Sequence, residues 1–235
     1  PQYPGGTRSF ELGTKLCENG HNVTVFASHF NHLSFEAVDL PEGTDHKIEM
    51  IGKLRFIWVR TTAYRGNDLK RLRNMLRYNK VVRRLSTAMV DNGDLEKPDL
   101  IIGSIVHPFA PLLAQKLSLK YGASYVFEIR DLWPQSFIDL GIWKKTTPAA
   151  RFFKVIEKKS LVHAKNVIAL SPMTADYLQE HYNYPPEKVH YIPNGAHADP
   201  PQPDPNAEIA KETPEALEKL KQNGKFIAMF SGSII

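Results

Sequence analysis

The sequence predicts an α/β fold, in which a doubly wound, Rossmann-like parallel sheet is covered by helices on both faces. Short β-branched or aromatic runs alternate with helical patterns along most of the 235 residues. The strand-like runs cover residues 23–27, 56–59, 99–102, 124–128, 166–170 and 188–192. The helical patterns lie near residues 7–18, 69–90, 108–121, 149–163 and 173–181. Because no tight turn can join parallel strands, this alternation indicates helical crossovers, and such sheets bind ligands at the carboxyl ends of their strands.

The amino-terminal elements follow this rule and then depart from it. The helix over residues 7–18 ends at Asn19-Gly20, a pair typical of helix C-termini. Residues 29–53 are polar and include three His residues and a Pro-Glu-Gly turn. We expect an excursion from the sheet here, with a hairpin near residues 48–59.

Three segments are expected along the chain. Residues 1–198 form an N-terminal lobe whose first strand is missing, because the glycine-rich turn at residues 4–6 has no strand before it. Residues 199–224 are a proline-rich linker followed by a short helix. Residues 225–235 begin a second lobe, which is truncated just after the strand-like run over 226–230.

The composition is that of an ordinary globular domain, with 42% hydrophobic and 23% charged residues. Cys17 is the only cysteine, which excludes an internal disulfide and favours a reducing compartment. No apolar run approaches the roughly 18 residues that a membrane span needs. The net charge of +5 and the pI near 9.2 favour an anionic partner: a phosphate-bearing molecule, a membrane surface or nucleic acid.

The first candidate site is the turn that opens the first helix. Gly5 and Gly6 let the backbone approach a ligand, and the free amides and dipole of a helix N-terminus favour a phosphate. Arg8 adds a positive charge. We predict these three residues as substrate-binding, although Pro-Gly-Gly also forms turns without any function.

The second candidate site follows the strand over residues 124–128. Arg130 and Asp131 are adjacent where this strand leaves the sheet. A carboxylate at this edge can orient or deprotonate a hydroxyl group, so we predict Asp131 as catalytic. The alternative is that Asp131 caps the next helix and pairs with its neighbour or with Arg151.

The third candidate is the face of the helix over residues 69–90. Five cations recur at spacings of three and four: Lys70, Arg73, Arg77, Lys80 and Arg84. Five apolar residues are expected on or near the opposite face: Leu72, Leu76, Val82, Leu85 and Met89. Because a solvated face usually mixes charges of both signs, we predict that this stripe binds an anionic membrane surface. Nucleic acid is disfavoured, since Tyr78 is the only aromatic residue available for base stacking.

Missing motifs narrow the function. The sequence has no G-x-x-x-x-G-K-[ST] loop and no G-x-G-x-x-G after a strand, which disfavours nucleotide hydrolases and dehydrogenases. It also has no D-x-D pair, and its nine His residues are scattered. We therefore predict neither a metal nor a cofactor. His107, just before Pro108, is expected to be a loop or capping residue.

Several motifs together resemble a known family. They are Pro-Gly-Gly at 4–6, Leu-Cys-Glu-Asn-Gly-His-Asn-Val-Thr-Val at 16–25, Glu-Ile-Arg-Asp-Leu-Trp-Pro at 128–134, Val-Ile-Ala-Leu-Ser at 167–171 and Tyr-Ile-Pro-Asn-Gly at 191–195. In this order they resemble the landmarks of family 4 glycosyltransferases with the two-lobed GT-B architecture. Phe-Ser-Gly-Ser at 230–233 is similar to the loop after the first strand of the second lobe. The resemblance covers most of the chain and is closest to enzymes that build bacterial surface polysaccharides.

The resemblance implies a retaining transfer of sugar from a nucleotide-sugar to a saccharide or lipid-linked acceptor, without metal. The first lobe would receive the acceptor, and the second would hold the nucleotide. Gly5, Gly6 and Arg8 would face the donor diphosphate, and Asp131 matches a position where relatives carry a His or Asp near the reacting hydroxyl. Three further residues in matching motifs would bind substrate: Arg130, Ser171 and Asn194.

The resemblance also sets limits. The paired glutamates spaced eight apart on the second lobe have no counterpart here, so we expect the donor site to lie outside this sequence and the chain alone to be inactive. The implied location is cytoplasmic, peripheral on the inner face of the membrane. Two other functions stay open: a nucleotide-sugar epimerase of similar architecture, and a non-enzymatic basic module that binds membrane or nucleic acid.

Overall fold

A computed structural model describes residues 8–31, 35–66, 69–105, 107–195, 218–219 and 221–222. The chain divides into two units, residues 1–194 and 195–235. In the second unit residues 218–219 and 221–222 are helical, and Lys221 pairs with Glu218 at 3.2 Å. The rest of the predicted linker over 199–224, and the predicted strand over 225–235, lie outside the described residues.

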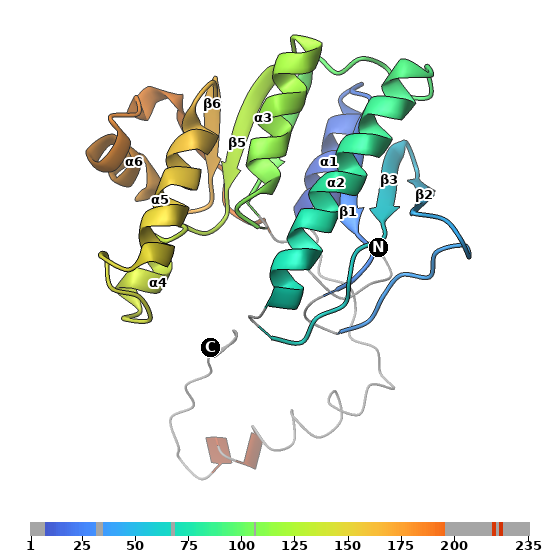
Figure 1. The fold of residues 1–235 in the computed structure, drawn as a ribbon. Coiled ribbons are helices and arrows are strands. Elements are labelled where there is room, and N and C mark those ends of the chain that lie inside the picture. The colour runs from blue at the N-terminus through green and yellow to red at the C-terminus, as the bar shows by residue number, and fades with distance from the viewer. Residues whose placement is uncertain are drawn as a thin grey trace. The chain divides into compact units, whose positions relative to one another are not determined.

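The first unit alternates strands and helices in the predicted order (Figure 1). Its helices are α1 Arg8–Glu18, α2 Leu69–Asp91, α3 Ala110–Tyr121, α4 Gln135–Asp139, α5 Pro148–Leu161 and α6 Thr174–Tyr182. Its strands are β1 Thr24–Ser28, β2 His46–Ile51, β3 Leu54–Val59, β4 Leu100–Ser104, β5 Ser124–Ile129, β6 Asn166–Ala169 and β7 Val189–Tyr191. A short 3₁₀ turn, Pro186–Lys188, leads into β7.

These strands form two sheets. One has the order β4-β5-β6-β7, with every neighbouring pair parallel. The other has the order β1-β3-β2, in which β1 is parallel to β3 and β2 is antiparallel to it. The predicted α/β fold with a parallel, helix-covered sheet is therefore confirmed. The β2–β3 pair is the predicted hairpin, and its turn contains Gly52 at φ +60°.

Strand β3 is buried on both faces. Leu54 and Phe56 pack in one apolar cluster with Cys17 of α1. Ile57 and Val59 pack in a different cluster with side chains of α2 and α3. Because successive side chains of a strand point to opposite faces, α1 covers one face of this sheet, and α2 and α3 cover the other.

The four-stranded sheet packs most closely against α3. A Cβ added at Gly103 of β4 would lie 2.8 Å from the Cβ of Ala114 and 3.0 Å from the Cα of Pro111. The glycine therefore allows α3 to lie directly on β4. Phe127 and Val167 have no exposed surface and form the centre of the cluster under α3, α5 and α6.

Local sequence signals set the ends of the helices. The side chain of Thr147 accepts a hydrogen bond from the Ala150 amide at 3.3 Å, and Pro148 occupies the first turn of α5. Helix α3 ends at Gly122, with φ +67°, whose amide donates to the Ser118 carbonyl. These signals fix where α3 ends and where α5 begins, and so they fix the lengths of the loops that join these helices to the four-stranded sheet.

Candidate functional site

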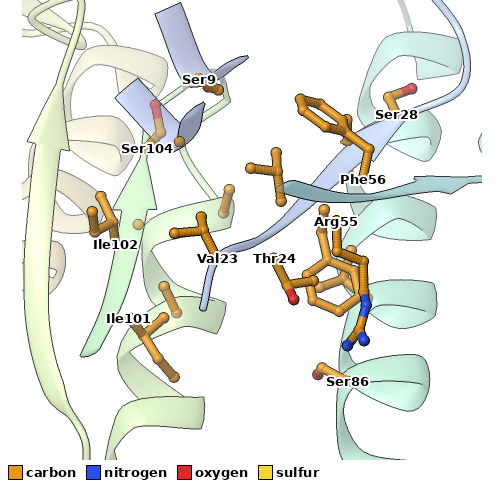
Figure 2. Close-up of a pocket in the computed structure, with 18 of the residues that line it drawn as sticks. Ser9, Val23, Thr24, Ser28, Arg55, Phe56, Ser86, Ile101, Ile102 and Ser104 are labelled. Carbon is orange, nitrogen blue, oxygen red and sulfur yellow. The ribbon is translucent and has the colours of Figure 1, made fainter. Parts of the chain in front are cut away.

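A cavity of about 1960 Å³ separates β1 from β4 (Figure 2). Val23 and Thr24 line one wall, and Ile101 and Ile102 line the wall across from them. Side chains of α1, α2 and α3 line the rest of its apolar part. This part of the cavity is hydrophobic, and neither of the two facing strands, β1 and β4, contains a charged residue.

Both walls are strand edges without a neighbour in the described part of the chain. β1 pairs only with β3, and β4 pairs only with β5. Leu100 and Ile102 of β4 are 50% and 43% exposed, although parallel strands are normally covered on both faces. The predicted strand before residues 4–6 stays a prediction.

The cavity continues to the carboxyl ends of the strands, and there its lining becomes polar. Residues from four such ends contribute: His29 after β1, Ser104 at the end of β4 and His107 after it, Arg130, Asp131 and Trp133 after β5, and Asn194 after β7. In parallel sheets this is the edge at which ligands bind. The polar end of the cavity is therefore the candidate site.

Arg130 and Asp131 lie in this polar end. Asp131 is exposed, and neither side chain forms a hydrogen bond or ion pair with the residues that the structure describes. The N-cap of α4 is Pro134, with no capping side chain, so Asp131 does not cap that helix. No ion pair with Arg151 is present among these residues either. The carboxylate is thus available to a ligand hydroxyl.

Arg8 forms a buried ion pair with Glu128, the penultimate residue of β5. Its Nε donates to Glu128 Oε1 at 2.8 Å, and the residues are 6% and 5% exposed. Nη2 donates to the Ile192 carbonyl at 2.8 Å, and Nη1 donates to the Pro193 carbonyl at 2.9 Å. Nη1 also lies 3.4 Å from Oδ1 of Asn194. In this structure Arg8 ties α1 to two strand ends, and its contact with a donor phosphate stays a prediction.

The other predicted substrate residues have different surroundings. Ser171 is exposed after β6, and its hydroxyl accepts a hydrogen bond from the Met173 amide at 3.3 Å. Asn194 is exposed and lines the cavity, whereas Ser171 does not line it. Gly5 and Gly6 lie outside the described residues. The structure therefore brings together Arg130, Asp131 and Asn194.

Sequence reasoning missed a cluster around Arg71, at the start of α2. The guanidinium of Arg71 lies 5.9 Å from the ring centroid of Trp133, and both residues line the polar end of the cavity. The ring of Tyr78, two turns further along α2, meets the His107 ring edge-on at 5.2 Å. The only available signal was the spacing of seven positions from Arg71 to Tyr78, which places both on one face of a helix.

His107 is in the β4–α3 loop, as predicted, but its side chain caps no helix. The N-cap of α3 is Phe109, without a capping side chain, and His107 is only 9% exposed. Neither ring nitrogen has a hydrogen-bond partner in the described part of the chain. Burial, together with the nearby charge of Arg71, lowers the pKa of His107 to about 4, so its imidazole is neutral at physiological pH.

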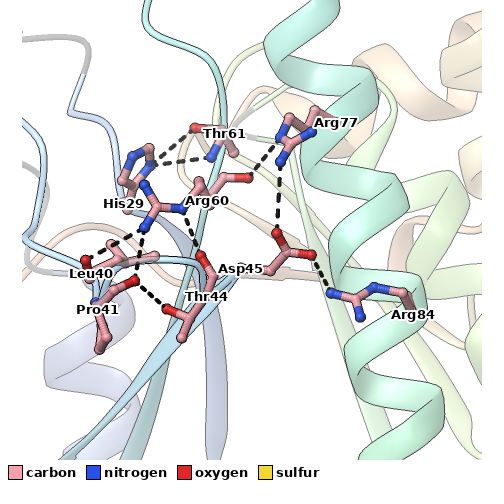
Figure 3. Close-up of polar contacts among 9 residues, drawn as sticks. All are labelled: His29, Leu40, Pro41, Thr44, Asp45, Arg60, Thr61, Arg77 and Arg84. Carbon is pink, nitrogen blue, oxygen red and sulfur yellow. Dashed lines mark hydrogen bonds and ion pairs between the residues drawn. The ribbon is translucent and has the colours of Figure 1, made fainter.

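A second polar network joins His29, the residue after β1, to the residues just after β3 and to the polar excursion over residues 29–53 (Figure 3). The amide of Thr61 donates to Nδ1 of His29 at 3.2 Å, and Nε of Arg60 donates to the Thr44 carbonyl at 2.7 Å. Burial and the charges of Arg60 and Arg77 lower the pKa of His29. This network holds the polar excursion against β3, and His29 is its one member that lines the cavity.

The predicted cationic stripe is exposed along α2. Two of its members, Arg77 and Arg84, pair with the same carboxylate, Asp45 of the polar excursion (Figure 3). The expected apolar face is wrong in part, because Leu72 and Leu76 are 40% and 52% exposed. They lie with the 82% exposed Leu69 beside the cations, where they line a shallow groove of about 320 Å³. The prediction is confirmed for Val82, Leu85 and Met89, which are buried on the inward face of α2 together with Met75.

Two features are absent from the described residues. These residues contain no cluster of three His, Cys, Asp or Glu side chains that could hold a metal ion. None of the helices that the structure describes is both long and apolar enough to span a bilayer.

Comparison with known proteins identifies the family. The family model described as Glycosyltransferase Family 4 matches residues 5–199, a range that includes every described helix and strand of the first unit. No curated protein matches the chain significantly. A member of this family transfers a sugar from a donor to an acceptor, which agrees with an open carboxylate at the carboxyl edge of a parallel sheet. The resemblance found in the sequence motifs is thus confirmed, and the chain belongs to glycosyltransferase family 4 as a lobe of the GT-B type.

Proposed function

We propose that this lobe belongs to a retaining glycosyltransferase that moves a hexose-type sugar from a nucleotide-sugar to a saccharide or lipid-linked acceptor in polysaccharide biosynthesis. The observation that carries the proposal is the position of Asp131 just after β5, where its carboxylate lines the cavity and has no partner among the described residues. A carboxylate there can orient the acceptor hydroxyl and take its proton as the new glycosidic bond forms.

The donor diphosphate is assigned mainly to a second lobe of the two-lobed enzyme. Gly5, Gly6 and the amides that open α1 would contact it from this lobe. No metal, cofactor or nucleic acid is required in this scheme, because the developing charge on the diphosphate is stabilised by amides and arginines. Arg130 is proposed to hold the acceptor or to position Asp131.

Product analysis tests this proposal. The active enzyme is incubated with a panel of nucleotide-sugars and lipid-linked acceptors, and the anomeric configuration of the product is read by NMR. We expect release of the nucleoside diphosphate and a product with the configuration of the donor. An inverted product would contradict the retaining assignment. Conversion of the donor into an epimer, without any acceptor, would favour the epimerase alternative.

We also propose that α2 docks on the anionic inner face of the cytoplasmic membrane. Its exposed leucines lie beside the cations, as in helices that bind at a bilayer interface. Each cation near such a surface contributes about 1 kcal/mol. Asp45 offsets part of the charge of Arg77 and Arg84. Docking there would bring the cavity to a lipid-linked acceptor.

Liposome sedimentation tests the docking. Binding should be stronger to anionic than to neutral vesicles, and salt should weaken it. Replacing the five predicted cations by Gln should abolish it, whereas Lys188→Gln, far from α2 in the sequence, should leave it unchanged. Equal binding to neutral and anionic vesicles would contradict the proposal. So would undiminished binding of the variant in which all five cations are replaced by Gln.

A further inference from the structure

Buried polar atoms without partners mark one corner of the cavity. They are the two ring nitrogens of His107 and the hydroxyl of Ser104, at the carboxyl end of β4. Buried polar groups in native proteins nearly always have a hydrogen-bond partner, since leaving them unpaired destabilises the fold. A ligand that enters the cavity would supply the partners that the described residues do not.

The chemistry of these atoms matches a hydroxyl-rich ligand. A neutral imidazole offers one N–H donor and one lone-pair acceptor, and a serine hydroxyl offers both as well. Each sugar hydroxyl can likewise donate and accept. A carboxylate or phosphate can only accept, so it would satisfy one nitrogen of His107 and leave the other unpaired.

Aromatic and cationic side chains complete the surroundings. The half-buried rings of Trp133 and Tyr64 line the same cavity and can pack against the apolar face of a sugar ring. Arg71 and Arg130 also line it, and guanidinium groups bind phosphate oxygens in a bidentate way. The buried carboxylate nearby, Glu128, is already neutralised by Arg8 and does not repel an anion.

We propose that Ser104, His107, Arg71 and Trp133 form the acceptor site and that it takes a phosphate-bearing saccharide. His107 and Ser104 bind hydroxyl groups of the sugar, Trp133 stacks on the ring, and Arg71 binds the phosphate. The role of this saccharide as the acceptor rests on the proposed transferase function, whereas its binding to these four residues does not depend on that function. With a hydroxyl of this saccharide at Asp131, the site holds the sugar and Asp131 receives the proton.

Direct binding to the 235-residue chain tests the site without any donor. The probes are glucose 1-phosphate, methyl glucoside and inorganic phosphate, titrated by NMR or by quenching of tryptophan fluorescence. We expect Arg71→Gln to weaken glucose 1-phosphate at least about tenfold and to leave methyl glucoside within about twofold. Ser104→Ala and His107→Phe should weaken both sugars, by about tenfold for His107→Phe, and leave inorganic phosphate unchanged.

Variants of exposed residues outside the cavity are the controls: Arg83→Gln on α2 and His190→Gln on β7. If His107→Phe does not fold, Ser104→Ala decides the hydroxyl contact and Arg71→Gln the phosphate contact, because both changes are small. Three results would overturn the site: no binding of glucose 1-phosphate at about 10 mM, binding unaffected by all three variants, or losses equal to those of the controls.

This experiment separates the site from the proposed function. If the chain binds glucose 1-phosphate as described while the active enzyme transfers no sugar, the site stands and the transferase proposal fails. If sugar is transferred but these variants bind the probe normally, the site fails alone.

Discussion

Replacing Arg8 by Met removes the cation from a buried ion pair and leaves the anion in place. Glu128 is 5% exposed and pairs with Arg8 at 2.8 Å. Without a partner its carboxylate must either stay charged in a dry site or bind a proton. We expect the loss to lower the free energy of unfolding by about 3–5 kcal/mol.

The other contacts of Arg8 add little to this estimate. The carbonyl groups of Ile192 and Pro193 belong to exposed residues, so water can replace the guanidinium there. The cost thus comes from Glu128 alone. Since small domains have total stabilities of about 5–15 kcal/mol, this one change would remove a large share.

Urea denaturation followed by circular dichroism measures the effect on Arg8→Met, Glu128→Leu and the double variant. The double variant should recover much of the loss, because two apolar side chains leave no unpaired charge. Lys15→Met is the control: this exposed residue of α1 pairs with Glu18 in solvent, and no measurable change is expected. A loss below about 1 kcal/mol for Arg8→Met, or a double variant as unstable as the two losses summed, would refute the reasoning.

Three more outcomes are expected. Gly103→Ala should destabilise the chain by about 1–3 kcal/mol, since its Cβ would meet α3 at 2.8 Å, whereas Gly66→Ala, with open space around it, should be neutral in the same urea titration. Glu157 accepts hydrogen bonds from Tyr177 and Tyr182, and burial raises its pKa to about 7. The folded chain therefore keeps a proton that the unfolded chain releases above about pH 4.5, and this stabilisation is lost as the pH rises through 7. The free energy of unfolding of Glu157→Gln, relative to that of the original chain, should therefore rise by about 3 kcal/mol when the pH is raised from 4 to 8. Urea midpoints of the two chains that change in parallel between these pH values would contradict this. Finally, the 235-residue chain alone should transfer no sugar, and turnover equal to that of a two-lobed enzyme would place the whole active site within it.

Much of the fold was predictable because it depends on local periodicity. β-branched runs and 3.6-residue patterns follow from which faces are buried, and both faces of β3 are covered. The position of Arg130 and Asp131 was predictable for a related reason, since residues just after a parallel strand always emerge at its carboxyl edge.

Long-range pairing was not predictable from the same patterns. Glu128 lies 120 residues from Arg8, and Asp45 lies 39 residues from Arg84. Nothing in local spacing indicates such partners, so the sequence alone predicts Arg8 as a ligand contact and all five cations of the stripe as a membrane-binding surface. The exposure of Leu72 was missed because the inward face of α2 is set by β3 and α3, which a helical period alone does not locate.

Turnover and donor binding of Asp131→Asn in the active enzyme test the central claim most directly. The amide keeps the shape of the carboxylate but cannot take a proton, so kcat should fall by at least about a hundredfold. The dissociation constant of the nucleotide-sugar should stay within about twofold, because Asp131 is assigned to the acceptor. Asp139→Asn, an exposed residue of α4 outside the cavity, should leave both quantities unchanged. A kcat of Asp131→Asn equal to that of the original enzyme would contradict the assignment of the active site.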